Sequence, residues 1–340
     1  MGAEALSSLM HAPAEAFDLT ARYVRICGAG SAFIIAYNVL GGVFRGMGNS
    51  KVPMYTAAVA CAFNVVGDFV FVAWLHMGVT GVALATVLAQ VFSVVLSWFF
   101  IRSAGVSFEL RRSYICFNFR MIKEIILVGA PVALQDLLVS ISFLVVLAIV
   151  NGMGVIASAG VGVAEKLCGF IMLVPSAYMQ YMAVFTAQNM GARKPQRARR
   201  ALKYCMWSSL AVGIPMGAIC FFYGYIPAGW FAADAAVVDA AAQYLRAYAL
   251  DCVIVSFLFC FIGYFNGREK TAFVLFQGLA GAFLVRIPVS YVMSITPGAT
   301  LFDIGLASPC ATVVQLVLCV LFLARLRKRR KAGLELATAS

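Results

Sequence analysis

The stretch KVPMYTAAVACAFNVVGDFVFVAWL, residues 51–75, decides how this chain folds. Between Pro53 and Leu75 its side chains are apolar or small, except for those of Asn64 and Asp68. About 20 apolar residues, at roughly 1.5 Å per residue, cross the hydrocarbon core of a bilayer, so the stretch predicts a transmembrane helix. Asn64 and Asp68 are spaced i,i+4 and therefore lie on one face of that helix, one turn apart.

An ionisable side chain at this depth costs about 2.5–3.5 kcal/mol on insertion scales unless another group pairs with it. The functional interpretation is that Asp68 belongs to a cation or proton site. The alternative is a hydrogen bond between helices that only packs the bundle. The sequence leaves both open, and we take the functional interpretation as the working hypothesis.

The composition is that of a membrane protein, because 63% of the residues are hydrophobic and only 12% are charged. A soluble domain carries about 25% charged residues. The apolar runs are long and do not alternate with polar residues, which excludes a β-barrel and predicts an all-α polytopic protein. We expect nine transmembrane helices, at residues 20–45, 53–75, 79–101, 124–150, 156–187, 203–227, 240–265, 271–295 and 302–325.

The net charge of +12 is distributed unevenly over the loops. Lys and Arg gather in the loops after the first, third, fifth and seventh spans and in the C-terminal tail, whereas the loops at 76–78, 151–155, 228–239 and 296–301 contain none. The positive-inside rule predicts a multi-pass protein of the plasma (bacterial inner) membrane with a cytoplasmic C-terminus. The basic runs are thus topology signals with some attraction to anionic lipid, and we expect no nucleic-acid partner.

An internal repeat relates the first three spans to the last three. Tyr23-Val-Arg25 recurs as Tyr244-Leu-Arg246, 221 positions later, and the same offset relates Asp18 to Asp239 and Arg45-Gly46 to Asn266-Gly267. The three spans between them have no partner, so the repeat predicts that three further N-terminal spans are absent from this chain. Two halves in parallel orientation favour a transporter that works by alternating access.

The repeat and the loops divide the chain into four parts. These are a partial N-lobe (1–101), a cytoplasmic connector (102–123), a C-lobe (124–326) and a basic cytoplasmic tail (327–340). The connector is basic but also contains aromatic residues, which is typical of an amphipathic segment on the membrane surface.

Two further side chains are predicted at the level of Asp68. Thr86 follows seven residues into the returning span, so both lie roughly 10 Å inside the outer boundary, and Tyr23 reaches a similar depth. Together with Asn64, these oxygen-bearing groups suit Na⁺ or a proton. The alternatives are a hydrogen bond from Thr86 to its own helix and an interfacial role for Tyr23.

The second half carries a different set of charges. Allowing one slipped residue, Arg286 and Ser290 stand at the repeat positions of Asn64 and Asp68. The remaining intramembrane charges are Asp136, Glu165, Lys166, Arg246 and Asp251. With Arg286 they sum to zero, which predicts a paired network; structural neutralisation and a proton relay or substrate counter-charge are both open.

No sequence motif indicates an enzyme. The chain lacks a phosphate-binding loop, a zinc-ligand spacing and a nucleophile elbow, and its acids are too isolated for a catalytic pair. We therefore expect no enzymatic activity, no cofactor and no metal beyond Na⁺ at Asp68, Asn64 and Thr86.

Taken together, several short motifs resemble the multidrug and toxin extrusion (MATE) family of cation-coupled antiporters. They are Ala21-Arg-Tyr-Val-Arg-Ile26, Tyr37-Asn38-Val-Leu, Arg45-Gly-Met-Gly-Asn-Ser-Lys-Val-Pro53, Asn64-Val-Val-Gly-Asp68, Gly78-Val-Thr-Gly-Val-Ala-Leu-Ala-Thr86, Gly129-Ala-Pro131, Ala187-Gln-Asn-Met-Gly-Ala192, Tyr244-Leu-Arg246, Asn266-Gly267 and Arg286-Ile-Pro288. Their order and spacing cover nearly the whole chain.

The resemblance implies twelve helices in two lobes, of which this chain would supply helices four to twelve. It implies an N-lobe cation site that matches Asn64, Asp68, Thr86 and Tyr23, together with an aspartate on a first helix that has no counterpart here. Some relatives carry C-lobe acids at positions that correspond to Val139 and Val255 in this sequence, so the C-lobe role transfers to Asp136 and Asp251 only weakly.

The resulting hypothesis is a monomeric secondary antiporter that exports amphipathic or cationic drugs in exchange for Na⁺ or H⁺. One alternative is a flippase for lipid-linked saccharides, which would need a cationic cavity built from Arg246 and Arg286. Another is a non-transporting fragment.

Overall fold

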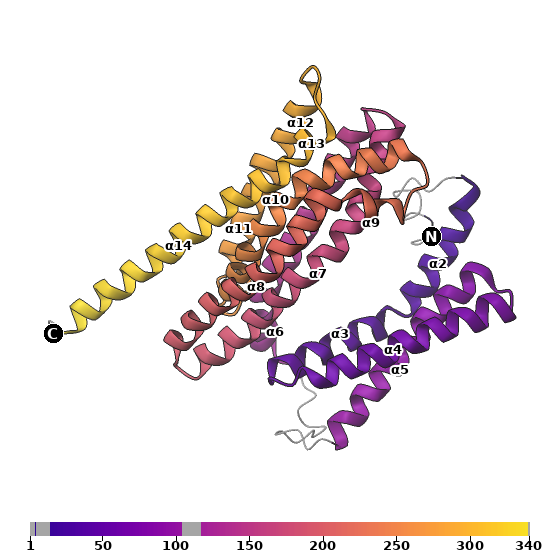
Figure 1. Ribbon diagram of the computed structural model, residues 1–340. Coiled ribbons are helices and arrows are strands. Elements are labelled where there is room, and N and C mark those ends of the chain that lie inside the picture. The colour runs from indigo at the N-terminus through magenta and orange to yellow at the C-terminus, as the bar shows by residue number, and fades with distance from the viewer. Residues whose placement is uncertain (1–3, 5–13, 104–116, 339–340) are drawn as a thin grey trace. The chain divides into compact units, whose positions relative to one another are not determined.

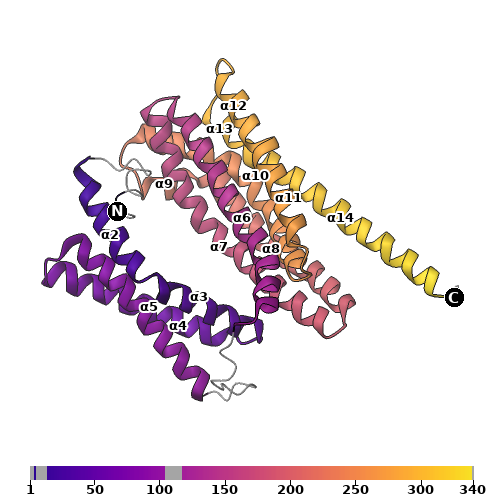
Figure 2. The ribbon, with the colours of Figure 1, turned by 180° about the vertical axis from the view of Figure 1, so that it is seen from behind.

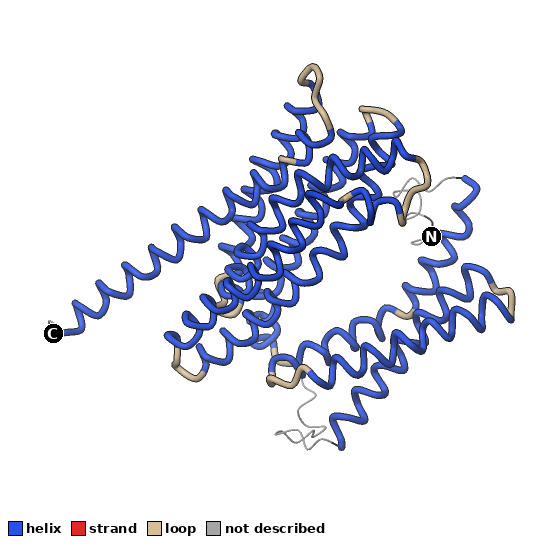
Figure 3. The backbone as a smooth tube through the Cα atoms, viewed as in Figure 1, coloured by secondary structure: helices blue, strands red, loops and turns tan. Residues whose placement is uncertain are grey.

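The computed structural model describes residues 4, 14–103 and 117–338, and every secondary-structure element in these ranges is helical (Figures 1 and 3). Two compact units, Met1–Cys116 and Phe117–Ser340, divide the chain. The division falls inside the predicted connector, most of which (104–116) lies outside the described residues, as does the amphipathic segment expected there.

The first unit contains three predicted spans. Its helices are α2 (Ala14–Ala29), α3 (Ser31–Gly46), α4 (Lys51–Asp68), the π-helical η1 (Phe69–Trp74) and α5 (Gly78–Ser103). Within this unit α5 packs against α2, α3 and α4.

The second unit contains the other six predicted spans. Its elements are α6 (Phe119–Asn151), α7 (Val155–Gly191), α8 (Pro195–Tyr223), α9 (Tyr225–Gly229), α10 (Ala235–Asn266), α11 (Thr271–Gly281), the π-helical η3 (Ala282–Arg286), α12 (Ile287–Ile295), α13 (Leu301–Gly305) and α14 (Ala307–Thr338). Figure 2 shows α6 and α11 running side by side, in agreement with their contacts.

Among the described residues, eight segments are long and apolar enough to span a membrane, and a ninth span results if the bent pair Phe17–Ala29 and Ser31–Gly46 counts as one. The prediction of nine membrane helices is confirmed in this sense, but the first is not one straight helix. Its two parts meet at 53°. A side chain at Gly30, the residue at the bend, would place its Cβ 2.6 Å from Val87, so the absence of a side chain lets α5 approach the break.

Close approach of helices also organises the second unit, where α10 is the most buried span, with 67% of its apolar window buried. Gly263 and Gly267 form a small-xxx-small pair on α10, and a Cβ at either position would lie within 2.3 Å of a backbone oxygen of α7. Gly213 and Gly217 on α8 form a second pair that packs against α10. Without side chains at these positions, the helices pack backbone to backbone, as small residues allow in membranes.

The two π-helical turns explain a feature of the internal repeat. A π turn holds one residue more than an α turn, and η3 ends at Arg286, whereas α4 is α-helical as far as Asp68. The extra residue of η3 shifts the offset between the halves from 221 to the 222 that relates Asn64 to Arg286. The one-residue slip is therefore a local widening of one helix.

The helix that contains the last span extends beyond the predicted end of that span at residue 325, because α14 continues through the basic residues to Thr338. The predicted boundary followed the end of the apolar run, but Lys and Arg are good helix formers and carry the helix onward. At the other end of the second unit, α6 starts five residues earlier than predicted. The Asn118 side chain caps it by accepting hydrogen bonds from the backbone nitrogens of Arg120 (3.1 Å) and Met121 (3.3 Å).

Candidate cation and substrate sites

The four residues predicted to bind a cation come from three helices of the first unit. Asp68 is the last residue of α4, directly before the π-helical turn, and Asn64 precedes it by one turn. Tyr23 lies on α2 and Thr86 on α5, both of which pack in the same unit. The strongest interaction of the Tyr23 phenol is with Cys27 of its own helix, and Thr86 and Asp68 act on it more weakly. The fold thus places these groups on helices that pack against one another within one unit.

The polar atoms at this point are only partly satisfied. The Asp68 Oδ1 and Asn64 Nδ2 atoms are buried and have no hydrogen-bond partner among the described residues. The Thr86 hydroxyl donates to the Val82 carbonyl at 3.0 Å, as the structural alternative for Thr86 expects, and this bond leaves its lone pairs free to accept or to ligate. A buried acceptor without a partner costs about 1–3 kcal/mol, so this arrangement of the Asp68 oxygen is unfavourable as it stands.

A second candidate site is a cavity of about 390 Å³ inside the second unit. It is lined by charged and polar side chains (Gln135, Asp136, Ser176, Tyr248, Asp251, Arg286, Thr312 and Gln315) and by apolar ones that include Val139, Phe143, Met172, Met179 and Val255. The positions where the family resemblance places acids, Val139 and Val255, thus face the same cavity as the two acids present here.

Arg286 is the most strongly held charge of this cavity. Its side chain is 7% exposed, it donates a hydrogen bond from Nη1 to the Ser142 hydroxyl at 3.0 Å, and its guanidinium lies 4.1 Å from the centroid of the Phe143 ring. Its Nε atom has no partner among the described residues. The cation–π contact and one hydrogen bond therefore compensate only part of the desolvation of this charge.

Asp251, on α10, is the opposing charge. It is 3% exposed, and its Oδ1 atom has no hydrogen-bond partner in the described part of the chain. Arg286 acts on Asp251 electrostatically, but the two side chains form no ion pair within 4.0 Å. A buried carboxylate and a buried guanidinium therefore face one cavity without direct contact.

The single paired network predicted for six charges is wrong for this fold. Asp136, Asp251 and Arg286 line the cavity, whereas Glu165, Lys166 and Arg246 do not. Lys166 and Arg246 are exposed, and Glu165 is half-buried beside Tyr244 with its Oε1 unpaired in the described ranges. Charge balance along the sequence could not reveal this, because the faces of α7 and α10 that meet are set by packing.

Sequence reasoning missed the groups that hold Arg286. Ser142 and Phe143 lie on α6, 144 and 143 residues away from it, and neither type of residue signals a site in an apolar run. The only available signal was the arginine itself, which at this depth requires partners.

The arginines expected of a saccharide flippase are not gathered in this cavity. Arg286 lines it together with two acids, and Arg246 is exposed outside it. The cavity of the second unit thus gives that alternative no support.

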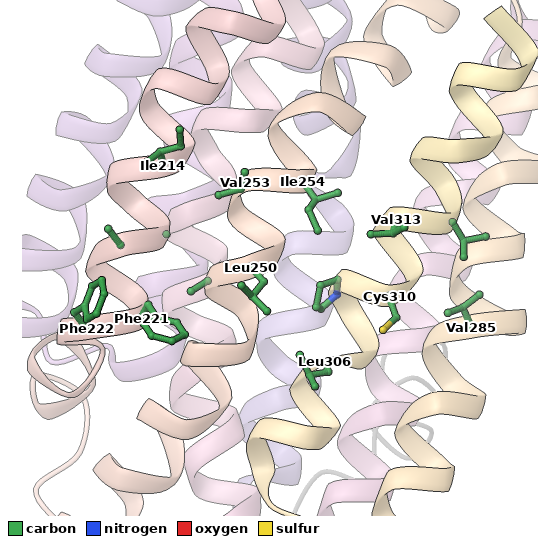
Figure 4. A pocket seen from close by; sticks show the side chains of 15 residues that line it. Ile214, Phe221, Phe222, Leu250, Val253, Ile254, Val285, Leu306, Cys310 and Val313 are labelled. Atoms are coloured by element: carbon green, nitrogen blue, oxygen red, sulfur yellow. The ribbon is translucent and has the colours of Figure 1, made fainter. Parts of the chain in front are cut away.

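A groove of about 920 Å³ lies between α8, α10, η3 and α14. Figure 4 shows it bordered by Ile214 and Phe221 of α8, by Leu250, Val253 and Ile254 of α10 and by Val313 of α14. All of its lining residues are apolar or small, which suits hydrocarbon chains of lipid and offers nothing to fix a charged substrate.

Membrane-spanning helices in two units, an unpaired carboxylate at membrane depth and a charged internal cavity define a polytopic membrane transporter rather than an enzyme. Residues 1–70 and 131–292 match the family model described as MatE. The chain belongs to the multidrug and toxin extrusion family.

Similar proteins agree with this assignment. The probable multidrug resistance protein YoeA of Bacillus subtilis strain 168 is 22% identical over 329 residues, which cover 91% of this chain and 68% of the relative. The multidrug export protein MepA of Staphylococcus saprophyticus is 24% identical over 296 residues, which cover 86% of this chain and 64% of the relative. The chain thus spans about two thirds of the length of these relatives.

Solved structures share the fold. A MATE protein in complex with MaL6 superimposes with a TM-score of 0.88 at 19% identity, over 96% of this chain and 74% of the other. A MOP superfamily transporter from Pyrococcus furiosus, for which a reversed polarity of the binding pocket is described, gives a TM-score of 0.88 at 19% identity, over 97% and 74%.

Proposed function

We propose that this chain acts in a secondary antiporter that exports amphipathic, often cationic compounds in exchange for Na⁺ or H⁺. The observation that carries the proposal is the Asp68 carboxylate, which is placed at membrane depth with one oxygen buried and unpaired among the described residues. Tyr23 and Thr86, on the mutually packed helices α2 and α5 of the same unit, are the residues that we propose as further oxygen donors. The multidrug names of the similar bacterial proteins support the class of substrate.

The coupling follows from the cost of a buried charge. An empty, ionised Asp68 is unfavourable where water cannot reach it, and a bound cation or proton removes most of that cost. The ion-free site therefore favours a conformation in which water reaches the carboxylate, and the occupied site favours one in which the carboxylate is buried. This difference in stability lets ion binding drive a change of conformation. Hard oxygen donors suit Na⁺, and a lone carboxylate suits H⁺, so both ions remain in the proposal.

Asn64 can direct either its amide oxygen or its NH₂ group toward Asp68, because the two are similar in size and exchange places when the side-chain amide flips. Its Nδ2 atom is buried beside Asp68 without a partner in the described chain. We propose that it stabilises whichever form of the carboxylate is present, as a donor to the ionised form and as an acceptor from the protonated one.

The orientation that we propose places the basic loops and α14's basic end in the cytoplasm, following the positive-inside rule. The proposed localisation is the plasma membrane, and the proposed functional unit is the monomer.

Efflux of a fluorescent organic cation from proteoliposomes, with sodium and pH gradients imposed separately, tests the proposal. We expect efflux driven by one of the two gradients, and a loss of at least about tenfold in Asp68→Asn, because each 1.4 kcal/mol of ion-binding free energy is tenfold in affinity. Asp18→Asn is the matched control, since Asp18 is an exposed acid of the same unit.

Undiminished gradient-driven efflux in Asp68→Asn would show that this carboxylate does not couple ion flow to export. Absence of any gradient-driven efflux in the unchanged chain would favour the non-transporting alternative. The two results are distinguishable because the second does not depend on a substitution.

A further inference from the structure

A groove between α7 and α8, separate from both sites above, combines two arginines with a wall of aromatic side chains. Its volume is about 850 Å³. Tyr178, Tyr181 and Phe185 of α7 form one side, and Arg197, Arg200, Tyr204 and Trp207 of α8 form the other. We call it the α7–α8 groove.

The spacing of these residues shows that each helix turns one stripe toward the groove. Tyr178, Tyr181 and Phe185 follow the i, i+3, i+7 pattern of a single helical face. Arg197, Arg200, Tyr204 and Trp207 follow the same pattern on α8 and extend roughly 15 Å along its axis. The charged end of the stripe lies next to the turn at Ala192–Lys194, on the side that the basic loops assign to the cytoplasm.

Among the described residues, no acidic side chain neutralises either arginine. In the part of the chain that the structure describes, no carboxylate lies within 4.0 Å of Arg197 or Arg200. The Arg197 guanidinium stacks at 5.7 Å from the centroid of the Phe185 ring, and Tyr181 in turn stacks on Phe185 at 5.5 Å. The charge is therefore held in place at the mouth of the groove while its hydrogen-bond donors stay free for an anion.

Three aromatic side chains of the groove are exposed. Tyr204 is 74% exposed, Trp207 71% and Tyr181 55%. Tyr and Trp are enriched where a membrane protein meets the headgroup region, because each ring has an apolar body and a polar tip. Free arginines above a deeper aromatic wall complement a molecule with an anionic head and an apolar chain.

We propose that the α7–α8 groove binds an anionic phospholipid of the cytoplasmic leaflet. The phosphate accepts hydrogen bonds from Arg197 and Arg200, and the glycerol and the upper acyl chain lie along Tyr181, Tyr204 and Trp207. Basic pockets between transmembrane helices on the cytoplasmic side are suited to such headgroups. The site is independent of the proposed coupling site at Asp68.

Trp207 provides a direct probe, because it lines the groove and the chain contains only three other tryptophans. The single-tryptophan variant Trp74→Phe/Trp98→Phe/Trp230→Phe is placed in phosphatidylcholine nanodiscs that contain either brominated phosphatidylglycerol or brominated phosphatidylcholine. We expect the brominated anionic lipid to quench Trp207 with an association constant at least about fivefold higher, since one basic residue near the surface contributes about that factor. Equal quenching by the two lipids would overturn the proposal without the need for an arginine variant.

Two double variants test whether the preference for the anionic lipid arises in the α7–α8 groove. Arg197→Gln/Arg200→Gln should bring the ratio of the two association constants close to one. Arg199→Gln/Lys203→Gln removes the same charge from the same helix, at residues that do not line the groove, and should leave the ratio unchanged. An equal loss in both variants would mean general attraction to the surface. Displacement of the lipid by millimolar inorganic phosphate would identify a free-anion site instead.

Discussion

Asp68 and Arg286 are intramembrane charges of opposite sign in the two related halves of the chain, and Arg286 is buried whereas Asp68 is only partly buried. Arg286 is fixed by Ser142 and by the ring of Phe143, whereas an oxygen of Asp68 has no hydrogen-bond partner among the described residues. A charge that the protein holds in place, as it holds Arg286, can stabilise the fold or act as a permanent counter-charge. An unsatisfied one gains most from an ion that comes and goes.

Exchange of Thr86 tests the oxygen set around Asp68. Thr86→Val removes a hydroxyl beside the carboxylate and keeps the shape of the side chain. We expect the concentration of the coupling ion that gives half-maximal efflux to rise about tenfold, which corresponds to the loss of one hydrogen bond or ligand. Thr86→Ser keeps the hydroxyl and should stay close to the unchanged protein. Equal behaviour of the two variants would exclude the Thr86 oxygen from the site.

Arg286 and Asp251 form a second test, because each is a buried charge that acts on the other. Arg286→Met should destabilise the protein by about 3–5 kcal/mol, since it leaves Asp251 without a counter-charge. Arg286→Met/Asp251→Asn should recover about 0.5–3 kcal/mol of that loss. Thermal unfolding in detergent, followed by tryptophan fluorescence, measures both. Strictly additive effects of the single variants would show that the two charges are not coupled.

At the scale of helices, glycine residues determine which spans pack closely against each other. Gly263 and Gly267 allow α7 to lie against α10, and Gly213 and Gly217 do the same for α8. The existence and approximate ends of the spans could be predicted from hydropathy, because lipid imposes long apolar helices. The bend at Gly30 and the π turns could not, because they depend on what approaches the backbone from another helix.

Two glycine-to-alanine changes separate packing from helix propensity. Gly263→Ala places a Cβ 2.2 Å from the Met179 carbonyl oxygen, and we expect a loss of about 1–3 kcal/mol in stability. Gly169→Ala, on the exposed face of α7 with no atom within 4 Å of the new Cβ, should be neutral or stabilise by up to about 1 kcal/mol. Unfolding temperatures in one detergent give the comparison, and a Gly263→Ala protein as stable as the unchanged one would contradict close packing of α7 and α10.

At the scale of the whole molecule, the chain consists of two helical units whose sites are built from their own helices. The cation-site candidates could be proposed as a group from their depth, and they lie on three helices of one unit, α2, α4 and α5. The cavity of the second unit could be predicted only in part. Asp136, Asp251 and Arg286 were recognisable as intramembrane charges, but the direction in which each points depends on packing between distant segments.

The orientation of the whole chain gives a further prediction. A green fluorescent protein fused after Ser340 should fluoresce, and alkaline phosphatase at the same place should be inactive, because the positive-inside rule assigns this basic end to the cytoplasm. The same reporters inserted between Pro297 and Ala299, in a loop without Lys or Arg, should give the opposite pattern. Matching signals at both positions would contradict the topology.

The π-helical turn η3 has one more consequence, which concerns the symmetry of the molecule. Because η3 holds one extra residue in its widened turn, a residue directly beyond it lies about 100° around the helix axis from the direction that a spacing of 221 would give. Past this turn, residues matched by a constant spacing of 221 no longer point in equivalent directions. The Asp68 carboxylate and the Arg286 guanidinium therefore do not stand at matching positions of the repeat. The two charges need not have the same function in the two halves.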